Sequence, residues 1–229
     1  MVEMRRAGRL PYGWITDASR MRWHVPTYRD PIEFVRAQAR AYRFGLWGDA
    51  DVLVEVWCES KSIAGMIHEE CKRLAVSLYP CGGFASASYA WQAAQGYAPY
   101  QAVEIVYVGD YDPAGVLVDV ALARELPTLT TTPIRFDRVA VNENQIAEFD
   151  LPTKPRKATD TRAPEVDDTV EAEAMPAPTL RALVRDAVER HLTPDALGYA
   201  TLMDDEGRKF LATFDLGGWG NKTAEAEIF

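Results

Sequence analysis

Between residues 50 and 140 the chain alternates short apolar runs with segments of helical periodicity. The apolar runs are rich in β-branched and aromatic residues, which favours strands. The segments between them repeat apolar residues every three or four positions, as a helix with one buried face requires. This alternation is typical of βα units around a largely parallel sheet, and it predicts an α/β fold with helices flanking the sheet.

The expected elements follow one another closely. Strands are predicted at residues 52–58, 76–79, 103–108 and 134–141. Helices are predicted at residues 61–75, 85–95, from Pro113 onward, from an Asn142 N-cap to 149, and at 178–192. Residues 151–173 have the composition of a connector with a basic patch, and no element is predicted after Pro194.

Composition excludes several classes of protein. A length of 229 residues suits one large domain with a small appendage. The three cysteines form no C-x-x-C pair and the three histidines are scattered, so neither a disulfide framework nor a zinc site is expected. No apolar run approaches the ~20 residues of a membrane span, and the N-terminus lacks the order of a signal peptide. We therefore expect a cytoplasmic protein without a membrane partner.

Charge is distributed unevenly along the chain. The net charge is −9, yet the first 45 residues carry nine Lys/Arg against four Asp/Glu. A basic arm therefore precedes an acidic body. Arg36, Arg40 and Arg43 fit two interpretations equally well, namely the solvated face of a helix or an arm that contacts phosphates.

Three carboxylates follow predicted strands. Glu59 comes directly after residues 52–58, and Asp110 and Asp112 come after residues 103–108. Parallel sheets bind ligands at the carboxyl ends of their strands. In an extended segment Asp110 and Asp112 project to one side, where they and Glu59 can hold Mg²⁺. The alternative is that the two aspartates only cap the following helix.

These residues carry a resemblance to a known family. Glu59 after a strand, the Gly83-Phe84 turn, and Gly-Asp-Tyr-Asp-Pro-Ala-Gly at 109–115 resemble the Toprim domain of topoisomerases, primases and some nucleases. Further segments resemble the A subunit of type IIB topoisomerase (topoisomerase VI) and its phage and prophage relatives. These segments are 141–146, 148–152, 154–162 and 170–176, the last leading into a helix, so that the resemblance spans about residues 50–192.

The resemblance implies a Rossmann-like Toprim fold and an organisation of the chain. Residues 1–48 are then a basic arm, the remnant of a winged-helix domain, 49–195 the Toprim domain and 196–229 a C-terminal tail. It implies Mg²⁺ as the cofactor, Glu59, Asp110 and Asp112 as its ligands, and Glu59 as the catalytic residue. Basic residues are expected to contact DNA, namely Arg5, Arg6, Arg9, Lys61, Lys154, Arg156, Lys157 and Arg162.

The sequence departs from the family pattern in two respects, namely two missing basic residues and a missing tyrosine context. Ser60 and Gly82 stand where the family has basic residues, and Lys61 can substitute for the first. The family cleaves DNA with a tyrosine on a winged-helix domain that precedes the Toprim domain. Here Tyr12, Tyr28 and Tyr42 lie in the arm, but none has the expected sequence context, so the nucleophile is expected to be absent.

The resemblance thus implies a Mg²⁺-dependent DNA-binding protein that takes part in strand cleavage or topology change. Its implied partners are DNA, a second copy of the chain and an ATPase B subunit, and its implied place is the nucleoid. A Toprim nuclease that uses metal-activated water and an inactive DNA-associated remnant are the alternatives. A haloacid-dehalogenase phosphatase fits poorly, because that family has its D-x-D on the first strand and Thr or Val where this chain has Ala114.

Overall fold

The computed structural model describes residues 2–9, 24–48, 50–82, 87–157 and 159–214. The chain divides into two compact units. Unit 1 combines residues 1–42 with 208–229, and unit 2 comprises residues 43–207. Each unit is described by itself. No helix among the described residues has both the length and the apolar character needed to span a bilayer.

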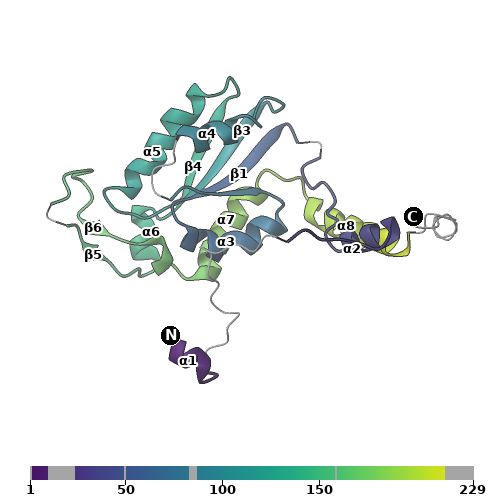
Figure 1. Cartoon of the computed structure of the whole chain (residues 1–229). Coiled ribbons are helices and arrows are strands. Elements are labelled where there is room, and N and C mark those ends of the chain that lie inside the picture. Colours follow the sequence, from purple (N-terminus) through teal and green to yellow (C-terminus); the bar gives the residue numbers. More distant parts are fainter. Residues whose placement is uncertain (1, 10–23, 49, 83–86, 158, 215–229) are drawn as a thin grey trace, which may run out of the picture. The chain divides into compact units, whose positions relative to one another are not determined.

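Unit 2 is built on a four-stranded parallel sheet, so the predicted α/β class is confirmed (Figure 1). The strands lie in the order β2-β1-β3-β4. Their bounds are Val52–Cys58 for β1, Ser77–Pro80 for β2, Ala102–Val108 for β3 and Ile134–Ala140 for β4. Strands β1 and β3 are central and almost wholly buried, which explains their uninterrupted apolar character.

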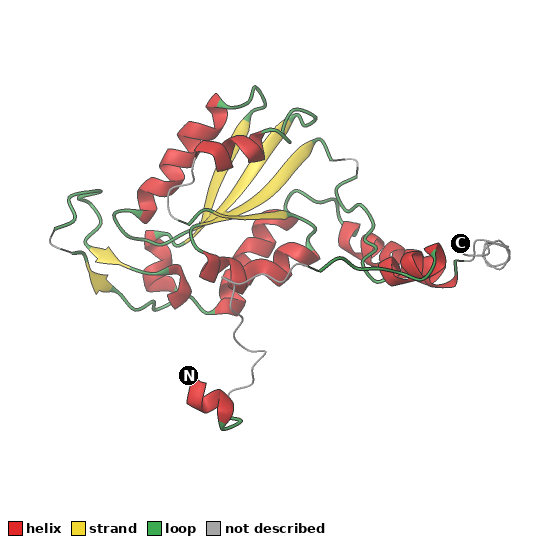
Figure 2. Cartoon of the chain, viewed as in Figure 1, coloured by secondary structure: helices red, strands yellow, loops and turns green. Residues whose placement is uncertain are grey.

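Helices cover both faces of this sheet (Figure 2). They are α3 (Lys61–Arg73), α4 (Ala87–Ala94), α5 (Gly115–Glu125), α6 (Glu143–Glu148) and α7 (Ala177–Glu189). On one face, α3 and α7 pack side by side, and α4 and α5 lie on the other (Figure 1). The sheet is therefore the middle layer of three.

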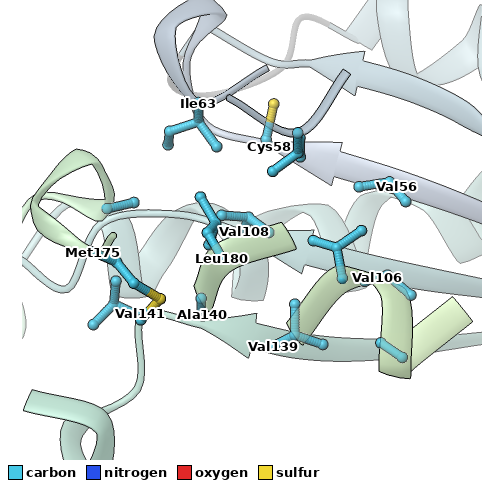
Figure 3. Packing of buried hydrophobic residues seen from close by; sticks show 14 of the residues in the cluster. Val56, Cys58, Ile63, Val106, Val108, Val139, Ala140, Val141, Met175 and Leu180 are labelled. Atoms are coloured by element: carbon cyan, nitrogen blue, oxygen red, sulfur yellow. The ribbon is translucent and has the colours of Figure 1, made fainter. Parts of the chain in front are cut away.

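Alternation along the strands builds two separate cores. Val56, Cys58, Val106 and Val108 point toward α3 and α7, where Leu180 of α7 meets them (Figure 3). The residues between them point to the opposite face, where Trp57, Ile105 and Tyr107 pack with α4 and α5. Because successive side chains alternate between faces, each strand contributes to both cores.

Several helices begin where the sequence predicts. Ser60 caps α3, since its Oγ accepts a hydrogen bond from the Ile63 N–H at 3.0 Å. Asn142 is the N-cap of α6, and its own N–H donates to Gln145 Oε1 at 3.0 Å. The predicted strands and helices of residues 52–149 and the helix at 178–192 are confirmed, with ends displaced by at most three residues.

Two regions differ from the sequence prediction. In the expected connector, β5 (Lys154–Pro155) and β6 (Asp168–Thr169) pair as a short antiparallel ladder, here called the basic hairpin (residues 154–169). A 3-10 turn, η3 (Ala172–Ala174), follows it. Helix α8 (Ala196–Thr213) occupies part of the stretch for which no element was predicted, and it crosses the boundary between the two units.

Unit 1 contains α1 (Val2–Arg6) and α2 (Pro31–Ala39). Asp30 caps α2 by accepting a hydrogen bond from the Glu33 N–H at 2.8 Å. Tyr28 packs edge-on against Phe34 with ring centroids 5.2 Å apart. These contacts give the arm local order of its own.

Candidate functional site

Glu59 and Asp110 meet at the carboxyl edge of the sheet. Strands β1 and β3 pair in register up to Cys58 and Val108, and the Glu59 N–H donates to the Val108 carbonyl at 2.9 Å. One residue further, the Asp110 N–H donates to Glu59 Oε2 at 2.9 Å. The parallel pairing of the two strands thus brings together carboxylates that are 51 positions apart.

Asp110 and Asp112 bind different elements. Asp110 Oδ1 accepts a hydrogen bond from the Ala172 N–H at 2.8 Å. Asp112 Oδ1 accepts from the Ala114 and Gly115 N–H groups at 2.9 and 2.5 Å, which caps α5. Between them, Tyr111 pairs through its backbone with Val170. The capping interpretation therefore describes Asp112. The prediction that Asp110 and Asp112 project to one side is not supported, because their hydrogen bonds go to different segments.

The second carboxylate oxygens of Glu59, Asp110 and Asp112 have no hydrogen bond from the described part of the chain. All three residues are partly exposed, so these oxygens are open to a solvent ion. Within the described residues, however, no three His, Cys, Asp or Glu side chains converge as a ready metal site. Mg²⁺ often binds one or two carboxylates and keeps several waters, so the hard oxygen donors fit a hydrated Mg²⁺.

Electrostatics at this edge favour a cation. Burial raises the pKa of Glu59 to about 7, and the negative charges of Asp110 and Asp112 add to the rise. The Asp110 N–H and Arg138 oppose it. Burial also raises the pKa of Asp110, with further contributions from Glu173, Asp112 and Glu171. A bound cation would relieve this mutual repulsion.

Arg138 of β4 is a site residue that the sequence analysis missed. Its side chain is only 12% exposed and lies 3.1 Å from Asp119 Oδ2. The guanidinium also donates to three backbone carbonyls, those of Asp110, Gly115 and Val141. Arg138 therefore ties the Asp110 turn to the start of α5. An arginine inside a strand that continues into Val-Ala-Val is a signal that could have indicated a buried role.

Ser60 and Lys61 connect the acidic edge to α3. Ser60 Oγ donates to Glu173 Oε1 at 3.1 Å while it caps the helix. Lys61, at the first position of α3, is exposed to solvent. Lys61 lies two positions after Glu59, and its exposed side chain is available to a phosphate group.

The basic hairpin carries most of the other predicted DNA contacts, and most of its cations are paired. Lys154 lies 3.1 Å from Glu171, and Arg156 lies 3.8 Å from Asp167. Arg162 contacts both oxygens of Asp160 and thereby lowers the pKa of that carboxyl to about 2. Lys157 is exposed and has no ion pair within the described residues. A phosphate backbone would have to compete with these carboxylates.

The hairpin belongs to the same edge of unit 2 as the carboxylates. The backbone pairing of Tyr111 with Val170 joins its end to the Asp110 turn. Asp160 is the main cause that raises the pKa of Arg162, and Asp112 contributes after it, so the guanidinium lies within electrostatic reach of Asp112. Arg162 is thus the hairpin cation for which a charge interaction with a predicted ion ligand is found.

The remaining predicted residues lie outside unit 2 or outside the described residues. Arg5 and Arg6 are on α1, and Arg9 follows it; Arg6 and Arg9 are exposed. Tyr28 and Tyr42 belong to unit 1, where the Tyr28 hydroxyl accepts a hydrogen bond from Gln38 Nε2 at 3.2 Å. Tyr12 and the Gly83-Phe84 turn lie outside the described residues.

Comparisons with protein-family models, with curated proteins and with solved structures find no match for this chain. The resemblance to the Toprim domain and to the topoisomerase VI A subunit therefore rests on the sequence motifs alone.

Proposed function

We propose that this chain is a Mg²⁺-dependent DNA-binding protein of the Toprim type, resembling the topoisomerase VI A subunit, that takes part in DNA strand cleavage or topology change. The observation that carries the proposal is the hydrogen bond from the Asp110 N–H to Glu59, made where two parallel strands end. Asp112 stands two residues further on, and cationic side chains lie at the same edge. DNA supplies the anions that such an edge would hold through a metal ion.

Each residue has a defined task in this proposal. Mg²⁺ held by Glu59, Asp110 and Asp112 would supply positive charge beside the scissile phosphate and anchor the 3′-hydroxyl side. Arg138 holds the backbone of the Asp110 turn, so the carboxylates keep their positions. Lys61, Lys154, Arg156, Lys157 and Arg162 would hold neighbouring phosphates. Tyrosine attack would leave protein joined to the 5′ phosphate, whereas water attack would leave free ends.

A metal titration tests the ion site. Mg²⁺ should raise the melting temperature of the wild type, because the ion binds only the folded state. At 100 times the dissociation constant the stabilisation is about 2.7 kcal/mol, or roughly 5–10 °C. Asp110→Asn combined with Asp112→Asn should abolish it. Glu69→Gln combined with Asp186→Asn removes two exposed charges from α3 and α7 and should retain it. Equal stabilisation of the aspartate variant would refute the ion site.

A salt series tests the DNA contacts. Duplex affinity should fall by about 0.9 log units per phosphate contact for each tenfold rise in salt. Replacing Lys154, Arg156 and Lys157 with alanine should flatten that slope without favouring any sequence. Lys72 on α3 and Arg124 in the last turn of α5 are exposed, and replacing both should leave the slope close to wild type. Absence of duplex binding at low salt with Mg²⁺ would favour the inactive remnant.

A cleavage assay separates the enzymatic alternatives. Supercoiled plasmid is incubated with protein and Mg²⁺ and then quenched with denaturant. We expect no covalent adduct from this chain alone, and at most weak nicking that requires Glu59. An adduct on Tyr12, Tyr28 or Tyr42 would show that the nucleophile is present after all. Free-ended nicks that survive replacement of all three tyrosines but not Glu59→Gln would establish the nuclease.

If the topoisomerase assignment holds, a second copy of the chain and an ATPase B subunit are its expected partners, and the nucleoid is its expected place. These follow from the proposed family alone. A mass measurement in solution tests the dimer directly.

A further inference from the structure

Within the described residues, the hydroxyl of Tyr107 has no hydrogen-bond partner. Tyr107 lies on β3 with 0% of its surface exposed. Among the buried side-chain nitrogen and oxygen atoms of the described residues, only Tyr107 Oη makes no hydrogen bond. Buried hydroxyls are nearly always paired, because an unmet hydrogen bond in the interior is costly. A hydroxyl of this kind can bind a water or a ligand group.

Glycine at position 109 lets the Tyr107 ring reach toward the end of the sheet. Residues 107 and 109 face the same side of β3, and a Cβ at Gly109 would lie 2.6 Å from Tyr107 Cε1 and 2.7 Å from its Oη. The phenol therefore occupies the space that a side chain at 109 would fill. Any larger residue there would displace the ring.

The space over Gly109 adjoins Glu59. The β1–β3 register pairs Cys58 with Val108, which places Glu59 beside Gly109 on the neighbouring strand. Burial is the main cause that raises the pKa of Tyr107, and the charge of Glu59 is the next. The Arg138 guanidinium lies 5.4 Å from the centre of the ring. The hydroxyl thus lies over Gly109, at the position next to Glu59 on the neighbouring strand.

We infer that Tyr107 is a further binding residue of the acidic site, whose hydroxyl hydrogen-bonds a water molecule that bound Mg²⁺ holds beside Glu59. The inference rests on the proposed function and adds a group that the sequence motifs do not contain. A tyrosine hydroxyl can accept from such a water and donate in turn. Mg²⁺ retains several of its waters in proteins, so an ion can bind where no three carboxylates converge.

Tyr97 provides a matched control for this inference. It is also 0% exposed and packs in the same core as Tyr107. Its hydroxyl is satisfied, because it donates to Glu55 Oε2 at 2.7 Å. Removing one hydroxyl oxygen from each tyrosine therefore compares an orphan with a partnered group at equal burial.

The experiment titrates MgCl₂ into wild type, Tyr107→Phe and Tyr97→Phe, and follows melting temperature and binding heat. Tyr107→Phe should keep or slightly raise the metal-free melting temperature and weaken Mg²⁺ affinity about tenfold, the usual effect of removing an outer hydrogen bond at a metal site. Tyr97→Phe should lower the metal-free melting temperature by several degrees and leave Mg²⁺ affinity unchanged.

Several outcomes would overturn the inference. Wild-type Mg²⁺ affinity in Tyr107→Phe would do so, as would a metal-free destabilisation as large as that of Tyr97→Phe, or a failure to fold. A wild type that ignores Mg²⁺ removes the proposed function and this inference together. If the wild type binds Mg²⁺, the Asp110→Asn, Asp112→Asn variant does not, and Tyr107→Phe binds it with wild-type affinity, then only the inference about Tyr107 is overturned.

Discussion

Glu55 in the middle of β1 and Glu59 directly after its end lie in different surroundings. Glu55, in the middle, is 3% exposed, and its Oε2 accepts hydrogen bonds from Trp57 Nε1 at 2.9 Å and from Tyr97 at 2.7 Å. Trp57 in turn stacks on Tyr79 with ring centroids 4.6 Å apart. Neutral donors and aromatic rings surround this carboxyl.

Glu59, at the end of the strand, receives one backbone N–H and faces other carboxylates. Burial is the leading cause of a raised pKa for both glutamates. The neighbours differ, because hydrogen-bond donors oppose the rise at Glu55 and like charges reinforce it at Glu59. A raised pKa alone therefore does not distinguish the two positions, whereas the like charges around Glu59 do.

The largest expected effect is a difference in unfolding free energy between alanine variants of the two glutamates. Glu55→Ala leaves the Trp57 and Tyr97 donors buried without an acceptor and opens a cavity, so it should cost about 3 kcal/mol of unfolding free energy. Glu59→Ala removes a carboxylate from a repulsive cluster and should change stability by less than about 1 kcal/mol. Urea unfolding at pH 7 without metal measures both. Equal costs would show that Glu59 is as structural as Glu55.

The comparison sharpens when it is extended to the positive charges of β4. Arg138 is 12% exposed and holds Asp119 and three carbonyls, so Arg138→Gln should cost about 2–3 kcal/mol. Arg135, three residues earlier, is 76% exposed and pairs with Glu104 at 2.9 Å. Arg135→Gln should cost less than about 0.5 kcal/mol. The same urea series tests both, and a larger loss at Arg135 would contradict the assignment of Arg138.

The smallest effect concerns pH. Because the pKa of Glu55 is raised in the folded protein, the fold binds a proton that the unfolded chain releases above its ordinary value of 4.5. Stability at this position is therefore highest at low pH and falls as the pH rises from 4.5 toward the folded pKa, by about 1.4 kcal/mol for each unit of difference. Glu55→Gln should remove that fall in urea midpoints between pH 4 and 9. An unchanged pH profile would show that Glu55 is not responsible.

The sheet was predictable because its signals are local. An uninterrupted apolar run such as Val103–Val108 and a one-faced helical pattern are written in adjacent residues, and a parallel sheet requires little else. The carboxylates were predictable as strand-end residues for the same reason. Their directions were not, since the Ala172 N–H that draws Asp110 comes from a segment 62 positions away.

The missed residues act through long-range geometry. Arg138 resembles any charged residue of an edge strand until its contacts with Asp119 and Gly115 are seen. Tyr107 reads as an ordinary apolar position of a strand, and only the ring's place over Gly109 distinguishes it. Helix α8 has a weakly one-sided apolar pattern, and only Ala200 and Asp204 are buried among its described side chains. Periodicity could not reveal such a helix.

The two amides that Asp112 caps have a kinetic consequence. While Asp112 Oδ1 holds the Ala114 and Gly115 N–H groups, their protons are shielded from exchange with solvent. An ion that turned this carboxylate away from the helix would expose both protons and quicken their exchange, whereas an ion that used only the second oxygen would leave them slow. The hydrogen-exchange rates of the Ala114 and Gly115 amides therefore report which carboxylate oxygen of Asp112 an ion would use.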